Sequence, residues 1–186
     1  MDARTLLTQR TSNPHLTDPA PTTNELCLLY EAALRAPDHG RLQPYRFLRI
    51  EAEARQSLGN VLTDEARIKG ELDALKIQKS AGLFLRAPLI IAVIASPKAH
   101  PKIPKEEQIQ TAACAAHAMI LAAYAEGIGA IWRTGEASRS PAVKAALGLL
   151  PEESIVAFLY LGKAARETVS PIKPELAPWM EKWRGV

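Results

Sequence analysis

The hydrophobic positions of the chain first show a helical spacing. Apolar residues recur at intervals of three and four between residues 26 and 33, which predicts an amphipathic helix that ends near Ala36. Thr22 and Glu25 stand just before this stretch at the spacing of a capping box, so the helix is expected to begin there.

Two other stretches have the pattern of strands. Residues 88–95 form a continuous β-branched run, which is typical of a strand buried on both faces, and residues 155–161 predict a second one. Shorter extended segments are expected at residues 45–50 and 130–134.

The longest predicted helix covers residues 106–127 and is rich in alanine. It is apolar on nearly all sides, so we expect it to be central and buried, with Gly127 as its C-cap. Its small side chains would let other helices approach closely, including across a subunit interface.

The other predicted helices are shorter. They cover residues 2–9, with Leu6 and Leu7 facing inward, two segments of residues 52–85 divided near Gly70, and residues 138–147, with Ser138 as cap. Helices outweigh strands, which predicts one α/β or α+β domain over residues 1–186. The Pro-rich tail, residues 164–186, carries Trp179 and Trp183 on one predicted helical face and is expected to dock on another subunit.

The composition is that of an ordinary globular domain. The chain has 186 residues, is 47% hydrophobic and has a net charge of +3, without the dense basic run of a nucleic-acid-binding protein. Neither a signal peptide nor an apolar run long enough for a membrane helix is recognised, which gives a cytoplasmic location as the default. Cys27 and Cys114 are predicted to be buried free thiols, and His117 a hydrogen-bonded core histidine.

Three polar clusters adjoin the apolar elements. They are residues 10–12, residues 35–43 and residues 132–135. Their Arg, Ser and Thr donors suit a phosphate. In the second cluster, Pro37 and Pro44 favour extended geometry for the residue before each, and Gly40 allows a positive φ. Taken singly, each cluster is better explained as an ordinary solvated loop or strand end.

Motifs for other chemistries are missing. Gly127 and Gly129 resemble half of a dinucleotide fingerprint, but they follow a helix and the third glycine is lacking. The sequence shows no P-loop, no metal-ligand spacing and no nucleophile–base arrangement. We therefore predict no metal and no catalytic side chain.

Taken in order, the segments of the chain resemble those of the nitroreductase family of flavin enzymes. The similarity rests on Arg10-Thr11-Ser12, on the loop from Ala36 to Phe47 with its Gln43-Pro44-Tyr45, and on Leu159-Tyr160-Leu161-Gly162. The resemblance implies an α+β fold with a central, mainly antiparallel sheet flanked by helices, and an intertwined homodimer with FMN at the subunit interface.

The resemblance also implies roles for particular residues. The residues expected to bind FMN are Arg10, Thr11, Ser12, Arg35, His39, Trp132, Arg133, Thr134, Lys163 and Arg166. Of these, Arg35 and His39 would reach the flavin of the other subunit. The residues expected to line the approach of the nicotinamide are Ala122, Ala123, Tyr124, Ala125, Glu126 and Gly127.

One departure from the family pattern concerns the flavin pyrimidine. Members often have Lys or Arg two residues after the serine, where this chain has Pro14. Arg35, His39 and Arg133 are the candidates to replace that cation.

The implied activity is an NAD(P)H oxidoreductase that passes electrons through FMN to a nitroaromatic or quinone-like acceptor. A relative that removes halogens or fragments flavin, and a flavin carrier or sensor, are the alternatives. The sequence does not distinguish NADH from NADPH as the donor.

Overall fold

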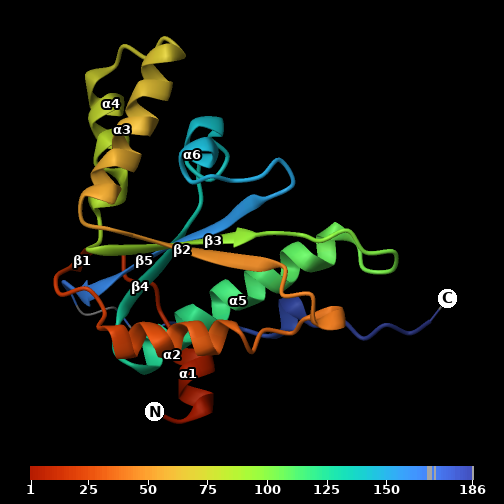
Figure 1. Cartoon of the computed structure of the whole chain (residues 1–186). Helices are drawn as coiled ribbons and strands as arrows, with labels where there is room; N and C mark the ends of the chain where they lie inside the picture. Colours follow the sequence, from red (N-terminus) through yellow and green to blue (C-terminus); the bar gives the residue numbers. More distant parts are fainter. Residues whose placement is uncertain (167–168, 170, 186) are drawn as a thin grey trace.

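The structure is a computed structural model, and it describes residues 1–166, 169 and 171–185. The predicted docking tail, residues 164–186, includes the four remaining positions, 167, 168, 170 and 186, which lie outside the described residues. Figure 1 shows the sheet at the centre, with helices on both of its faces and the tail extending away from it.

The sheet is antiparallel throughout. Its order is β1-β5-β3-β2, and β4 also pairs with β5. The strand bounds are β1 (Leu16–Thr17), β2 (Tyr45–Glu51), β3 (Leu89–Ala95), β4 (Gly129–Arg133) and β5 (Ser154–Ala164). The predicted α+β class is confirmed. The two-residue β1 was missed because it is extended only through its pairing with β5.

The helices lie close to their predicted positions. Their bounds are α1 (Ala3–Gln9), α2 (Thr23–Ala33), α3 (Glu53–Ile68), α4 (Ala74–Ala81), α5 (Lys105–Ala125) and α6 (Pro141–Ala146). The capping box of Thr22 and Glu25 is present at the start of α2. The cap of α6 is Ser140 and not Ser138, because Ser140 Oγ accepts from Val143 N while Ser138 Oγ donates to the Gly135 carbonyl.

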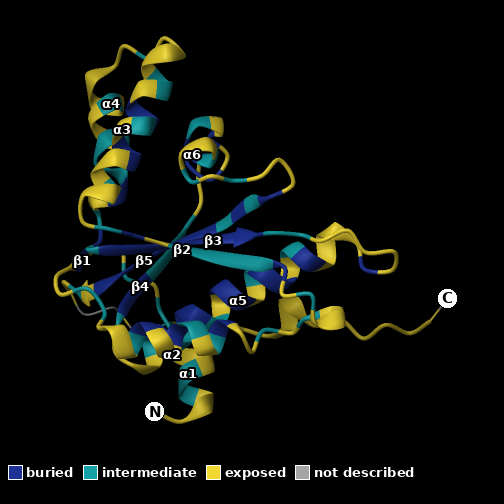
Figure 2. Ribbon diagram, in the orientation of Figure 1, coloured by how far each residue is buried: buried dark blue, intermediate teal, exposed yellow. Residues whose placement is uncertain are grey.

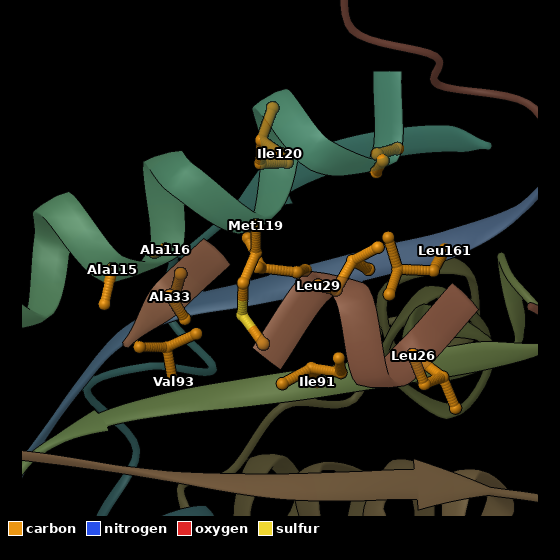
Figure 3. Packing of buried hydrophobic residues seen from close by; sticks show 14 of the residues in the cluster. Leu26, Leu29, Ala33, Ile91, Val93, Ala115, Ala116, Met119, Ile120 and Leu161 are labelled. Carbon is orange, nitrogen blue, oxygen red and sulfur yellow. The ribbon is translucent and has the colours of Figure 1, made fainter. Parts of the chain in front are cut away.

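The core lies on both faces of the sheet. All seven residues of β3 are buried, and they alternate between the two faces. On one face α2 and α5 pack against Ile91 and Val93, and Figure 3 shows Met119 and Leu29 converging on them. On the other face Phe84 and Phe158 pack with α3.

The hairpin of α3 and α4 projects from the sheet, and its far end is largely exposed (Figure 2). Gly59 lets the two helices touch, since a Cβ at this position would lie 2.3 Å from the Ala81 carbonyl oxygen. Residues of both helices line a hollow together with residues 133–137, which include the end of β4.

Several predicted burials are wrong for the single chain. Cys27 and Cys114 are exposed, His117 is exposed on α5, and Leu7 is 65% exposed. Helix α5 is buried along one face only, because the sheet and α2 cover only that side.

The aromatic tail also departs from expectation. Trp179 ends a 3-10 helix (Ala177–Trp179), whereas Trp183 lies outside any helix, so the two do not share a helical face. Both are more than 80% exposed.

Candidate functional site

The site begins at the end of β4. Side chains alternate along a strand, so Trp132 packs toward the α2–α5 side. Arg133 lies on the opposite face, with its guanidinium carbon 5.6 Å from the centre of the Tyr160 ring. Thr134 follows at once and is exposed.

The segment after α1 runs beside β4. Asn13 N donates to the Ala130 carbonyl at 2.8 Å, and the Tyr124 hydroxyl donates to the Gln9 carbonyl at 3.0 Å. Between these anchors, Arg10 Nη1 lies 3.5 Å from Ser12 Oγ. Arg10 and Ser12 are thereby held beside the edge of the sheet.

The same segment then joins the end of β5. Thr17 pairs with Lys163 in register, and Ala165 N donates to the His15 carbonyl at 3.0 Å. Arg166 follows directly. Residues 15–17, which follow the first predicted cofactor-binding segment, therefore lie beside the last one.

Two facing glycines make this close approach possible. Gly129 of β4 pairs with Gly162 of β5. A Cβ on Gly129 would lie 2.6 Å from Leu16 Cδ2, and one on Gly162 would lie 2.8 Å from the Thr17 carbonyl oxygen. Side chains at either position would push β1 away from the sheet.

A groove of about 530 Å³ lies where these segments meet. We call it the arginine groove. Its lining is Pro14, His15, Leu16, Thr17, Arg86, Arg133, Ala165 and Arg166. Three of these are arginines and none is a carboxylate, so the groove suits an anion.

A larger hollow of about 940 Å³ lies next to it, between the α3–α4 hairpin and residues 133–137. Arg133 lines both spaces. The hollow mixes charges, since Lys76 on its wall is paired with Glu71 at 3.0 Å. It is therefore a less selective site than the arginine groove.

Tyr160 lies beneath the arginine groove as a neutral group. Burial raises the pKa of its phenol to about 12, against the opposing effect of the charges of Arg133 and Arg86. Its hydroxyl donates to the Leu83 carbonyl at 3.2 Å. The phenol thus supplies no negative charge to the arginines above it.

The loop predicted around Arg35 and His39 lies elsewhere in the chain. His39 Nδ1 is 2.9 Å from Glu107 Oε2 at the start of α5, whereas the Arg10 segment adjoins Tyr124 at the end of α5. At about 1.5 Å per residue, the helix separates them by about 25 Å. Within one subunit, Arg35 and His39 are not brought to the arginine groove.

The geometry of this loop is partly as predicted. Gly40 has a φ of 73°, and the Asp38 carboxylate accepts from the backbone N–H groups of Leu42 and Gln43. Gln43, which precedes Pro44, has a φ of 47° and not the expected extended value. The two hydrogen bonds from the loop backbone to Asp38 hold Gln43 in this turn.

Residues 122–127 were predicted to line the approach of the nicotinamide. They form the end of α5 and the start of the turn that leads to β4. Gly127 has the positive φ of a C-cap, 72°, and Tyr124 is the contact to the Arg10 segment. None of the six lines either of the two hollows. Their role remains a prediction.

One lining residue, Arg86, was missed from the sequence. It stands alone between a 3-10 helix (Leu83–Leu85) and β3, in no motif. The pairing of both β3 and β4 with β5 brings it near Arg133, so no local signal could have found it.

The described residues fit an anionic cofactor such as a flavin phosphate better than a metal. Arg133 Nε is buried and has no hydrogen-bond partner, which leaves a donor for a ligand. Among the described residues no His, Cys, Asp and Glu side chains form a metal-binding group. None of the described helices is long and apolar enough to cross a membrane.

Comparisons with known proteins agree with this fold. The sequence profile of the nitroreductase family matches residues 7–163. The chain is 41% identical to the protein named "Putative NAD(P)H nitroreductase YdjA" of Escherichia coli (strain K12), over 97% of this chain and 98% of that one. It is 40% identical to a similarly named protein of Haemophilus influenzae, over 90% and 93% of the two chains.

Solved structures show the same architecture. A nitroreductase-like protein of Bacillus cereus superposes with a TM-score of 0.81 at 22% identity and covers 100% of this chain and 97% of its own. A structure from Desulfovibrio desulfuricans, described as a nitroreductase in complex with FMN, has a TM-score of 0.73 at 25% identity, with 98% and 97% covered.

Proposed function

The chain belongs to the nitroreductase family, and on that premise we propose that it is an FMN-dependent NAD(P)H oxidoreductase. The observation that carries the proposal is the arginine groove, which lies between residues 14–17 and residues 165–166 and contains three arginines without a carboxylate. The naming of its relatives as NAD(P)H nitroreductases and the FMN-bound structural neighbour support the same assignment.

The residues present divide between the two ends of the cofactor. Arg10 and Ser12, together with Lys163 and Arg166, would hold the phosphate through charge-assisted hydrogen bonds. The backbone of residues 132–134 would lie against the isoalloxazine, and Thr11 would contribute from the Arg10 segment. When bound, FMN supplies the redox chemistry by taking two electrons and a proton from the nicotinamide and passing them to an acceptor.

The protein's own part is to bind, orient and set the charge around the flavin. No side chain is required as nucleophile or general base, because a backbone N–H suffices at the reacting nitrogen. The acceptor is proposed to be a nitroaromatic or quinone-like compound that enters beside Thr134.

We propose that the cofactor site is completed by a second subunit. Arg35 and His39 lie at the opposite end of α5 from the arginine groove. Two copies with their α5 helices antiparallel would place the loop of one beside the groove of the other. The exposed face of α5, with Cys114 and His117, is the surface available for this contact. The exposed tail, with Trp179 and Trp183, would pack on the partner.

Cys114→Arg is expected to abolish both the dimer and FMN binding, since it places a long cation in the middle of the exposed α5 face. Sedimentation velocity with detection at flavin wavelengths measures both together. Asn60→Arg, on the exposed side of α3, is the matched control and should leave the dimer intact. A monomeric Cys114→Arg protein that keeps its FMN would contradict the shared site.

The direct test of the function is a visible spectrum of the purified protein after FMN loading and desalting, followed by anaerobic addition of NADH or NADPH. We expect a retained flavin spectrum that is bleached by a nicotinamide and restored by a nitroaromatic or quinone. A retained flavin that neither nicotinamide reduces would favour a carrier or sensor. Loss of the flavin during desalting, even after loading at high FMN, would refute the proposal.

A further inference from the structure

Two arginines from distant segments lie near one buried tyrosine, Tyr160. Arg133 lies over the Tyr160 ring, and the half-buried Arg86 lines the same arginine groove. Both are near enough to act on the Tyr160 phenol electrostatically. Their two positive charges therefore act on the same part of the groove lining, around Tyr160.

Neither arginine forms an ion pair within the described part of the protein. The ion pairs formed there involve other side chains, and Arg133 Nε is buried without a hydrogen-bond partner. The groove lining has no carboxylate, and Tyr160 remains a neutral phenol. Adjacent, partly buried cations without a counter-charge are costly unless an anion joins them.

We propose that Arg86, acting with Arg133, forms the cationic pair that faces the negative charge of reduced FMN. This inference rests on the proposed function. Uptake of two electrons and one proton leaves the flavin one negative charge richer, so a positive pair at the pyrimidine end favours the reduced form.

The placement of Pro14 supports Arg86 in particular. Pro14 occupies the position where the resembling family often has a cation, and it lines the same groove as Arg86. Arg86, which lies just before β3, would thus supply the positive charge that Pro14 lacks. Three residues were named from the sequence as candidates to replace the missing cation. Arg133 lines this groove, whereas Arg35 and His39 do not reach it within the same subunit.

The test is the two-electron midpoint potential of the FMN-loaded protein, measured anaerobically against a reference dye. Arg86→Gln should shift the ratio of reduced to oxidised flavin at a fixed potential about tenfold toward the oxidised form, which is about 30 mV for a two-electron couple. Arg86→Lys should recover most of the shift. Arg139→Gln removes an equal charge from an exposed turn and should leave the potential unchanged.

Binding measurements separate this role from a phosphate contact. The affinity of Arg86→Gln for oxidised FMN and for oxidised riboflavin, which lacks the phosphate, should change by a similar, small factor. A loss confined to FMN with an unchanged potential would overturn the inference and assign Arg86 to the phosphate. Arg86→Met, which keeps most of the aliphatic stem, replaces Arg86→Gln if the latter does not fold.

The inference and the proposed function fail in different ways. An Arg86→Gln protein that binds FMN and has the potential of the unaltered protein would overturn the inference alone. Failure of the unaltered protein to bind FMN would overturn both.

Discussion

Arg10→Ala is expected to lower the affinity for FMN by about tenfold to a hundredfold. The guanidinium lies beside Ser12 at the edge of the sheet, where it would hold the phosphate, and a hydrogen bond to a charged group contributes about 1.5–3 kcal/mol. Fluorescence titration with FMN measures the change. Riboflavin, which has no phosphate, should bind the variant and the unaltered protein equally.

The control for this prediction is Arg4→Ala, which removes the same type of side chain from an exposed position on the neighbouring helix α1. It should leave both affinities unchanged. If Arg10→Ala bound FMN as tightly as the unaltered protein, Arg10 would not be a phosphate ligand, and the segment after α1 would have another role.

Glu153→Gln is expected to destabilise the fold by about 3 kcal/mol. Glu153 is 5% exposed and receives two hydrogen bonds of 2.7 Å from Arg46, through Nε and Nη2. The Leu150 N–H donates a third at 3.0 Å. Removing one partner from such a pair leaves a cation without its counter-charge. Chemical denaturation at pH 7 measures the loss.

The same ion pair predicts an acid transition. The hydrogen bonds from Arg46 lower the pKa of Glu153 from 4.5 to about 2. A depressed carboxyl pKa gives stability that is complete above pH 4.5 and is lost as the pH falls toward 2. At about 1.4 kcal/mol per pH unit this amounts to about 3 kcal/mol, less some screening because Arg46 is one-third exposed.

The control for both effects is Glu51→Gln, whose ion pair with Arg49 is about half-exposed. It should change the stability little. If the stability of the unaltered protein changed no more between pH 5 and pH 3 than that of Glu153→Gln, the ion pair would not be the source of the acid sensitivity.

The sequence was most informative where local rules decide the structure. The capping box at Thr22 and the β-branched run of β3 each depend on neighbouring residues, and both elements formed as predicted. Of the residues that the resemblance implied, Arg133 and Arg166 line the arginine groove, whereas Arg10 and Ser12 do not line it.

The failures concern features that depend on distant partners. β1 exists only because β5 pairs with it, and Arg86 joins the site only through the pairing of β3 and β4 with β5. Cys114 and His117 were expected to be buried because α5 is apolar all round. One chain covers only part of the helix, and periodicity cannot tell a face that meets the core from one that meets a second subunit.

The pairing of β1 with the end of β5 also sets the order of events during synthesis. Leu16 is in register with Ala164, so β1 has no partner strand until almost all of the chain has been made. Closing so long a loop is entropically costly and slow. A nascent chain that stalls before β5 therefore has no arginine groove, since Ala165 and Arg166 of its lining follow that strand. On the proposed function, such a chain would not yet capture the cofactor.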